Sequence, residues 1–317
     1  MVKKYEFVVD DTAKEHHTTV TRIRALVDID TLMGVVKAGT LGGFIEHEAN
    51  LSHEGTCWVA NNARVLDKAF VQQEAYVGDN AIVTCSSEIT GKAHISDNAR
   101  VCGQSKIRGN ATIGDNAVIN MDFLGQITDH ASVYDTAKIY GDALILDAAT
   151  VCDRAVVRDN AMVSGEAVVG GSAAITQEAH VKDNAKICEY AEISGKAVVK
   201  QHAIVGGKTK VSDNVTIEGK ALLKADYHLK GNSRIRIKPA SRARYASDYV
   251  VLAMKEGNTI MTLTKNQDVQ IQYQDDVSLL NEFVQNTLPS LKMEDQEELR
   301  LFIQLGQARL TRPQTEN

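Results

Sequence analysis

Histidine is the side chain of this sequence best suited to acid–base chemistry, and nine are present. His130 directly follows Asp129, so a carboxylate stands next to an imidazole in the chain. A histidine that a carboxylate holds near a neutral pKa can take a proton from a hydroxyl or an amine. His130 with Asp129 is therefore the candidate catalytic pair. The alternative interpretation is a solvated histidine at a turn.

The other histidines and the cysteines carry weaker signals. Four histidines are expected on the surface, because they precede a core residue or fall at a turn: His94, His180, His202 and His228. Four more precede residue 57 and lack the spacing of metal ligands: His16, His17, His47 and His53. An odd number of cysteines without a CxxC pair argues against a disulfide framework and a zinc site: Cys57, Cys85, Cys102, Cys152 and Cys188. We predict no metal site and no required cofactor.

Charge and hydropathy exclude several classes of partner. The chain of 317 residues has a formal net charge of −6 and no long run of one sign, which disfavours a nucleic-acid partner. The first residues lack the apolar core of a secretory signal, and no stretch approaches the ~18 apolar residues that a membrane helix needs. We expect a cytoplasmic protein without a membrane partner. A phage or prophage origin fits equally well.

An aliphatic residue recurs at every sixth position through most of the chain. Thirty such residues fall in two registers, which two extra residues separate. The first register is Val59, Val65, Val71, Val77, Val83, Ile89, Ile95, Val101, Ile107, Ile113 and Ile119. The second is Ile127, Val133, Ile139, Ile145, Val151, Val157, Val163, Val169, Ile175, Val181, Ile187, Ile193, Val199, Val205, Val211, Ile217, Leu223, Leu229 and Ile235. A fixed period of six is typical of hexapeptide β-helix coils.

Each hexad is predicted to form one corner and one side of a coil. Side chains alternate along a strand, so Val83 faces the core with the small Ala81, whereas Ile82 faces outward. The corners carry residues that tolerate the left-handed backbone region: Asp79, Asp97, Asp115, Asp159, Asp183 and Asp213, each followed by Asn, and Gly91, Gly141, Gly165, Gly195 and Gly219. Three corners close one coil, so we expect about ten coils and a prism about 48 Å long.

The periodic segment divides the chain into three predicted parts. Residues 57–238 form the β-helix, and all three prolines follow it, as expected where no strand can spare a backbone donor. Residues 1–56 form an N-terminal β cap, with strands at Tyr5–Val9 and Thr18–Asp28. Residues 239–317 form a small α+β module. Its predicted elements are strands Tyr249–Met254, Thr259–Leu263 and Val269–Tyr273, then helices Asp276–Thr287 and Glu294–Leu310, the latter with Leu299, Phe302, Ile303 and Leu310 on one side.

A motif ahead of the hexads resembles a known family. The runs KAGTLGGFIE (37–46), NLS (50–52) and CWVANNARV (57–65) are similar to the first segment of the YdcK-type transferases and of related prophage repeat proteins. The resemblance covers about residues 20–235. The hexads themselves resemble those of the hexapeptide-repeat acyltransferases, which implies a left-handed parallel β-helix.

These resemblances imply a coenzyme-A-dependent O- or N-acyltransferase. Such enzymes generally work as trimers, with acetyl-CoA or another acyl-CoA in the groove between two prisms and a histidine as general base. Loops usually leave the coils to shelter that histidine. Here the break in the hexads is Asn120–Gln126, which we expect to expose Met121 or Phe123. His130 follows this break and would be the base.

Two predicted faces of the coil are candidates for contacts with partners. One presents outward residues that become more apolar along the chain, which indicates either a subunit contact or scattered surface aliphatics. These residues are Tyr76, His94, Thr112, Ser132, Thr150, Val168, Lys186, Ile204 and Leu222. A second face either binds an anionic ligand or is simply solvated. It carries Lys138, Arg158, Glu192, Lys210, His228 and Lys230.

Three functions remain open from the sequence. The nearly uninterrupted coils favour a non-catalytic β-helix scaffold or binding protein, assembled as a homodimer or homotrimer. The resemblance favours the acyltransferase. The prophage likeness favours an inhibitor that presents a rigid acidic surface to a host protein, since Asp79, Asp97 and Asp115 should stack as a ladder.

Overall fold

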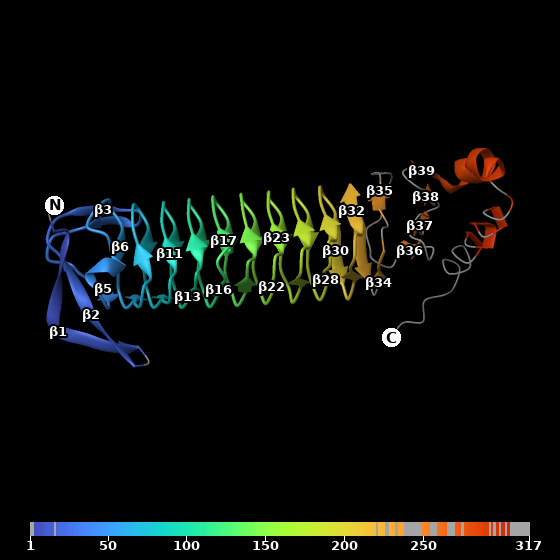
Figure 1. Ribbon diagram of the computed structural model, residues 1–317. Helices are drawn as coiled ribbons and strands as arrows, with labels where there is room; N and C mark the ends of the chain where they lie inside the picture. The colour runs from blue at the N-terminus through green and yellow to red at the C-terminus, as the bar shows by residue number, and fades with distance from the viewer. Residues whose placement is uncertain are drawn as a thin grey trace, which may run out of the picture. The chain divides into compact units, whose positions relative to one another are not determined.

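The computed structural model describes residues 3–15, 17–219, 221–225, 228–231, 234–237, 249–253, 259–264, 270–273, 276–291, 293, 296–297, 299–301 and 303–304. The chain divides into two compact units, Met1–Lys182 and Asp183–Asn317, and each is described by itself. Short parallel strands coil through both units, seven coils in the first and three in the second. This confirms the predicted fold class, a parallel β-solenoid of about ten coils (Figure 1).

Three parallel sheets form the sides of the coils in the first unit. The sheet that we call the hairpin face contains β7 (Arg64–Val65), β10 (Ile82–Val83), β13 (Arg100–Gly103), β16 (Val118–Met121), β19 (Lys138–Gly141), β22 (Val156–Val157) and β25 (Ala174–Ile175). The middle face contains β8 (Phe70–Val71), β11 (Glu88–Ile89), β14 (Lys106–Ile107), β17 (Gln126–Ile127), β20 (Leu144–Ile145), β23 (Met162–Val163) and β26 (His180–Val181). The tyrosine face contains β6 (Trp58–Val59), β9 (Tyr76–Val77), β12 (His94–Ile95), β15 (Thr112–Ile113), β18 (Ser132–Val133), β21 (Thr150–Val151) and β24 (Val168–Val169).

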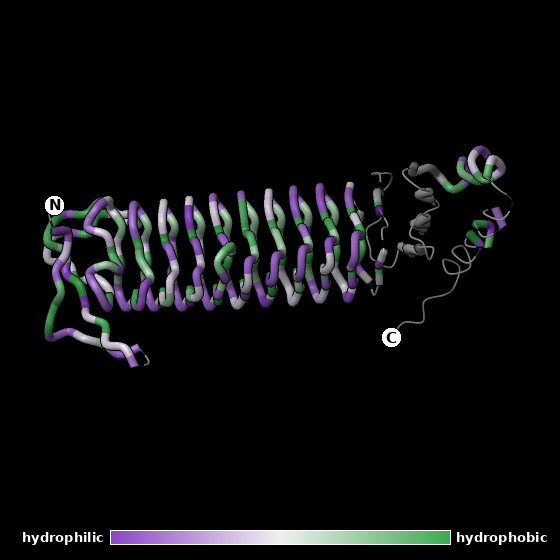
Figure 2. The backbone as a smooth tube through the Cα atoms, viewed as in Figure 1, coloured by the Kyte–Doolittle hydropathy of each residue, from purple (hydrophilic) through white to green (hydrophobic). Residues whose placement is uncertain are grey.

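The register of these sheets follows the hexad period. Ile82 pairs with Arg64 of the preceding coil and with Arg100 of the following one, so equivalent residues stack 18 positions apart. All thirty predicted core aliphatic residues are buried, and the least covered of them, Leu229, is 6% exposed. Figure 2 shows the same alternation of apolar and polar stretches along every coil of the first unit. The predicted inward register is therefore confirmed.

The corners adopt the left-handed backbone conformation that the sequence predicts. Asp79, Asp97 and Asp115 have φ values of 56°, 56° and 52°, and Gly91 has a φ of 70°. Each of these aspartates accepts a hydrogen bond from the backbone N–H of the equivalent residue one coil later. The short polar side chain thus stabilises the turn and links it to the next one.

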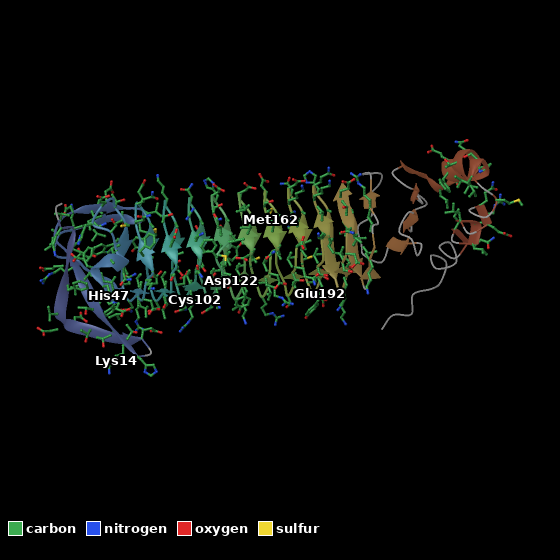
Figure 3. All side chains as sticks on the ribbon, viewed as in Figure 1. Lys14, His47, Cys102, Asp122, Met162 and Glu192 are labelled. Carbon is green, nitrogen blue, oxygen red and sulfur yellow. The ribbon has the colours of Figure 1, made fainter. Side chains whose placement is uncertain are left out.

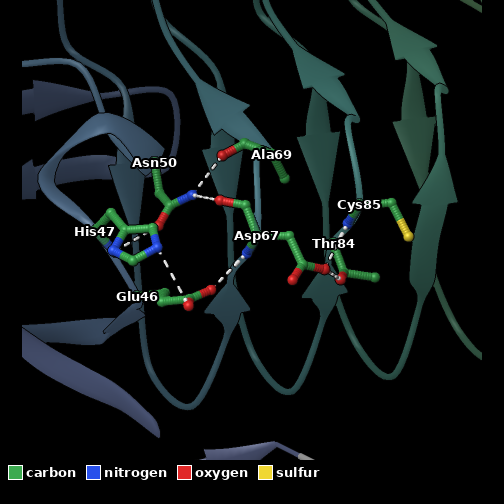
Figure 4. A network of polar contacts seen from close by, with 7 residues as sticks. All are labelled: Glu46, His47, Asn50, Asp67, Ala69, Thr84 and Cys85. Atoms are coloured by element: carbon green, nitrogen blue, oxygen red, sulfur yellow. Dashed lines mark hydrogen bonds and ion pairs between the residues drawn. The ribbon is translucent and has the colours of Figure 1, made fainter. Parts of the chain in front are cut away.

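A second column of corner bonds begins in the cap (Figure 4). Glu46 accepts the backbone N–H of Asp67 at 2.7 Å, and its other carboxylate oxygen lies 3.2 Å from Nε2 of His47. The Asp67 carboxylate in turn accepts the hydroxyl of Thr84 and the N–H of Cys85. These two bonds, together with the charge of His47, lower the pKa of Asp67.

The two extra residues lengthen one coil to 20 residues without disturbing its core. β16 extends to Met121, which is buried, and the corner that follows carries the surplus. Phe123 is 63% exposed, as one of the two predicted outcomes requires, and Nζ of Lys106 lies 4.6 Å from its ring centroid. Asp135 then donates its N–H to Asp115, so the ladder of corner bonds crosses the longer coil.

An N-terminal β cap covers the first coil, as predicted. Its elements are β1 (Tyr5–Glu15), β2 (Thr18–Ala25), β3 (Ile29–Thr31), β4 (Gly34–Val36), β5 (Leu41–Ile45) and the 3₁₀ turn η1 (Glu48–Asn50). β1 and β2 form an antiparallel hairpin, β2 pairs with β5, and β5 pairs in parallel with β7. The cap therefore continues the hairpin face and occupies the edge of its sheet. Gly42 is required here, because a Cβ would approach the Trp58 ring to 2.6 Å.

The β1–β2 hairpin folds back against the solenoid, and this was not predicted. β1 is six residues longer than expected, and Figure 3 shows Lys14 near its far end, beneath the first coils. Val20, Phe44, Leu66 and Ile82 form a buried cluster against which Ala13 packs. Ile82 points outward from its coil as predicted, yet it is only 9% exposed, because the hairpin covers it.

The second unit contains three coils and a small module. Its coil strands are β27 (Lys186–Ile187), β28 (Glu192–Ile193), β29 (Val198–Val199), β30 (Ile204–Gly207), β31 (Lys210–Val211), β32 (Thr216–Gly219), β33 (Leu222–Ala225), β34 (His228–Leu229) and β35 (Arg234–Ile237). The module has an antiparallel sheet of β36 (Tyr249–Ala253), β37 (Thr259–Thr264), β38 (Gln270–Tyr273) and β39 (Asp276–Leu279). Helix α1 (Leu280–Glu282), a π-helical turn (Phe283–Thr287) and a 3₁₀ turn (Leu288–Ser290) follow.

The module differs from its prediction in one element. The predicted helix Asp276–Thr287 begins at Leu280, because 276–279 pair with β38 as a fourth strand and satisfy their backbone groups there. In the predicted second helix, Leu299 and Ile303 are buried, whereas Phe302 and Leu310 lie outside the described residues, as do His16, Pro239 and the turn at 256–258. No helix among the described residues has both the length and the apolar character to cross a membrane.

Candidate binding groove on the hairpin face

A groove runs along the hairpin face of the first unit, over four successive coils. It encloses about 420 Å³. Two columns of side chains line it, one at the corner and one on the strands: Asn62, Asn80, Asn98 and Asn116, and Arg64, Ile82, Arg100 and Val118. Ile82 also belongs to the cluster beneath the hairpin, so the groove begins where the hairpin ends.

The corner column of the groove is an asparagine ladder. The amide nitrogen of Asn62 donates to the amide oxygen of Asn80 at 3.4 Å, Asn80 donates to Asn98 at 3.3 Å, and Asn98 donates to Asn116 at 3.4 Å. All four residues are exposed. These long bonds leave amide groups open to a ligand, at intervals of about 4.8 Å, the spacing of stacked strands.

The strand column alternates cations with aliphatic residues. The outward residues of successive strands pair in the order Arg64, Ile82, Arg100, Val118, Lys138 and Val156. A positive charge therefore recurs at every second coil, about 9.6 Å apart. An apolar side chain separates each cation from the next.

The cations of this column differ in how far they are neutralised. Arg64 forms an ion pair with Glu15 of the hairpin, while its Nε atom is buried and has no hydrogen-bond partner within the described part of the chain. Arg100 and Lys138 are exposed, and neither has an ion-pair partner among the described residues. The groove thus holds one shielded guanidinium and leads to two open cations.

This arrangement suits an anion that also carries hydroxyl groups. An arginine can bind a carboxylate, sulfate or phosphate with two parallel N–H bonds. Asparagine amides can both donate to and accept from a hydroxyl. Ile82 and Val118 offer apolar surface between these polar groups.

The predicted catalytic pair lies on another edge of the solenoid and does not form a carboxylate–imidazole contact. The carboxylate of Asp129 accepts the hydroxyl of Thr128 at 2.9 Å. His130 is exposed, and its Nε2 lies 3.0 Å from the amide nitrogen of Asn110. The backbone turn at Asp129, with a φ of 61°, directs the two adjacent side chains to different neighbours.

The predicted acidic ladder is present in the structure. Asp79 accepts the N–H of Asp97 at 3.2 Å, Asp97 that of Asp115 at 3.0 Å, Asp115 that of Asp135 at 3.1 Å, and Asp135 that of Asp153 at 2.9 Å. These carboxylates therefore stabilise the corners. They run beside the asparagine ladder, since each aspartate directly precedes the asparagine of its corner.

The tyrosine face presents the outward residues that the sequence predicts. Tyr76 pairs with His94, and their rings meet edge to face at 5.5 Å between centroids. Burial lowers the pKa of His94, although Asp79 and Asp97 act in the opposite direction. His94 is therefore a partly buried, uncharged side chain on a flat surface. His180 is half-buried and His202 is exposed, while the side chain of His228 lies outside the described part.

The sequence prediction did not single out Arg64, Arg100 or the asparagine column as a site. A signal was available, because Asn80, Asn98 and Asn116 follow the corner aspartates at intervals of 18 residues. Lys138, which was singled out, extends the same column. Within the described residues, no three His, Cys, Asp or Glu side chains gather as metal ligands, and all five cysteines are free.

Comparison of the chain with protein-family models and with curated proteins gave no match. The resemblance to the YdcK-type transferases therefore stays a prediction, and the class that the fold defines is the parallel β-solenoid.

Proposed function

We propose that this protein is a non-catalytic solenoid scaffold that binds an acidic polysaccharide along its hairpin face. The observation that carries the proposal is the pairing of two periods in one groove. Amide groups recur at every coil and cations at every second coil. A polymer with one carboxylate for every two hydroxyl-bearing units would present the same ratio of groups.

The spacing separates this ligand from other polyanions. Cations on the hairpin face recur about every 9.6 Å, twice the distance between stacked strands. The phosphates of a DNA strand recur about every 3.4 Å, and carboxylates on one side of an extended acidic peptide about every 6.7 Å. Neither of these periods matches the cations. The net charge of −6 also disfavours a polyanion of high charge density.

The test is a titration of the full-length protein with hyaluronan oligosaccharides, in which carboxylated and neutral sugars alternate. We expect saturable binding that weakens with salt, and no binding of uncharged dextran. Replacement of Arg100 by alanine should weaken binding at least about tenfold, the effect of losing a charge-assisted hydrogen bond. Arg158→Ala is the matched control, because Arg158 is exposed and lies outside the groove lining.

Two results would contradict the proposal. Equal binding of dextran and hyaluronan would remove the role of the cations. Equal loss in Arg100→Ala and Arg158→Ala would show that net charge, rather than the groove, holds the ligand. Tighter binding of single-stranded DNA than of hyaluronan would assign the groove to a different polyanion.

The other predicted functions are tested separately. Saturable binding of acetyl-CoA to a trimer would support the acyltransferase, with His130→Ala as the variant to examine next. A solution mass at or above that of a dimer would support the predicted homo-oligomer. The inhibitor prediction requires a host protein that recognises the ladder from Asp79 to Asp153.

A further inference from the structure

A buried lysine and a buried cysteine meet in the cap of the first unit. Lys4 is 4% exposed and Cys57 is fully buried. Nζ of Lys4 lies 3.2 Å from Sγ of Cys57. An amine nitrogen and a thiol sulfur at this distance are close enough to react after a small movement.

The neighbours of this pair hold it in place without neutralising the amine by a carboxylate. Nζ of Lys4 also donates to the backbone oxygen of Cys57 at 2.9 Å, and it lies 3.4 Å from that of Gly55 and 3.5 Å from that of Glu54. Within the described part of the chain, no carboxylate pairs with Lys4. Burial raises the pKa of the Cys57 thiol, and the charge of Lys4 opposes this rise.

The surrounding backbone fixes both ends of the contact. The N–H of Lys4 bonds to Nδ1 of His53 at 3.1 Å, and the Tyr5 hydroxyl donates to the backbone oxygen of Leu51 at 2.8 Å. Lys4 directly precedes β1 and Cys57 directly precedes β6. A bond between their side chains would therefore fasten the first strand of the cap to the first coil.

We propose that Lys4 and Cys57 form a covalent sulfenamide, an Nζ–Sγ bond, when the protein meets a peroxide. Hydrogen peroxide first oxidises the Cys57 thiol to a sulfenic acid and leaves as water. The Lys4 amine, having lost a proton, then attacks the sulfur and displaces hydroxide, which takes that proton and leaves as a second water. The sulfur loses two electrons, which reduce the peroxide. Condensation of a sulfenic acid with a nitrogen is an established branch of cysteine oxidation.

Cys85 provides an internal comparison. It is exposed at a corner, with a φ of 62°, and none of its described contacts is with a lysine nitrogen. Peroxide should reach Cys85 sooner than Cys57, which requires a local opening of the cap. Oxidation at Cys85 should nevertheless end without a bond to another residue.

The experiment treats the folded full-length protein with hydrogen peroxide and maps its tryptic peptides under non-reducing conditions. We expect one linked pair, containing Lys4 and Cys57, whose mass is two hydrogen atoms less than the sum of its peptides. Trypsin should no longer cleave after Lys4, and a thiol reductant should restore both cleavage and the free cysteine. Peroxide treatment in guanidinium chloride should give no linked pair, because the proximity is lost.

Two variants separate the reaction from simple contact. Lys4→Arg keeps the positive charge, but its guanidinium does not lose a proton, so the linked pair should disappear. Cys85→Ser should leave the linked pair unchanged. If Lys4→Arg fails to fold, the comparison of folded and denatured wild-type protein still decides. Recovery of Cys57 only as a thiol or as sulfinic acid, or a linked pair that retains an oxygen atom, would overturn the proposal.

Discussion

The carboxylate of Asp97 accepts the backbone N–H of Asp115 at 3.0 Å, 18 residues later in the chain. The N–H of Asp97 is itself bound by Asp79 at 3.2 Å, so each aspartate both receives and supplies one bond of the corner ladder. The side chain that stabilises one turn thereby fixes the position of the next. This coupling makes the corners as regular as the core.

Replacing Asp97 by alanine should lower the free energy of unfolding by about 2 kcal/mol. The variant loses a charge-assisted hydrogen bond and places an ordinary residue in the left-handed backbone region. Asp97→Asn should cost less than about 1 kcal/mol, because asparagine tolerates this backbone and keeps an acceptor oxygen. Denaturant unfolding of the two variants checks the difference, and equal losses would contradict a role for the side-chain bond.

Replacing Val163 by aspartate should destabilise the first unit by more than about 4 kcal/mol. Val163 is fully buried, and the change places an unpaired charge in the core. Met162→Asp is the matched control, since Met162 is the preceding residue and faces outward. Thermal unfolding should show a large loss for the first variant only. The reverse order would contradict the register of β23.

The corner at Asp67 should make stability depend on pH in the acid range. Hydrogen bonds from Thr84 and Cys85 lower the pKa of Asp67 below its ordinary value of 3.8, so the ionised form is favoured in the folded state. Its contribution is present above that ordinary value and is lost as the pH falls through the lowered one. The difference in melting temperature between the wild type and Asp67→Asn should therefore shrink as the pH falls below 4. A difference that is constant with pH would contradict this.

Replacing Glu15 by glutamine should strengthen hyaluronan binding about two- to fivefold, the usual strength of a partly exposed ion pair. The hairpin carboxylate pairs with Arg64, and its loss frees a third cation for the ligand. The gain should fall as salt is added. Glu74→Gln is the control, because Glu74 forms an exposed pair with Lys92 outside the groove. Weaker binding in Glu15→Gln would show that the pair positions Arg64 productively.

The sequence predicts the solenoid almost completely because its period is strict. Core residues such as Val83 and Val163 recur at fixed intervals, and side-chain alternation then places every neighbour. The exposed Phe123 at the longer corner follows from the same argument. Local spacing and local backbone preference determine all of these features.

The groove could not be predicted in the same way, because it depends on contacts without a period. The hairpin folds back and brings Glu15 to Arg64, 49 residues away, and it buries Ile82. Similarly, adjacency in sequence indicated that Asp129 would hold His130, but the left-handed turn directs the carboxylate to Thr128. Sequence neighbours at a corner are poor guides to side-chain contacts, whereas residues 18 apart are good ones.

The longer coil between Asp115 and Asp135 shows how this architecture can change during evolution. Because the bond between those two aspartates still forms, the two surplus residues remain confined to one corner. A duplication or deletion of 18 residues would preserve every stacking partner, whereas other insertions must be absorbed at a turn. Growth of the first unit is thus possible in whole-coil increments, and each increment would lengthen the hairpin face by one more binding position for a polymer.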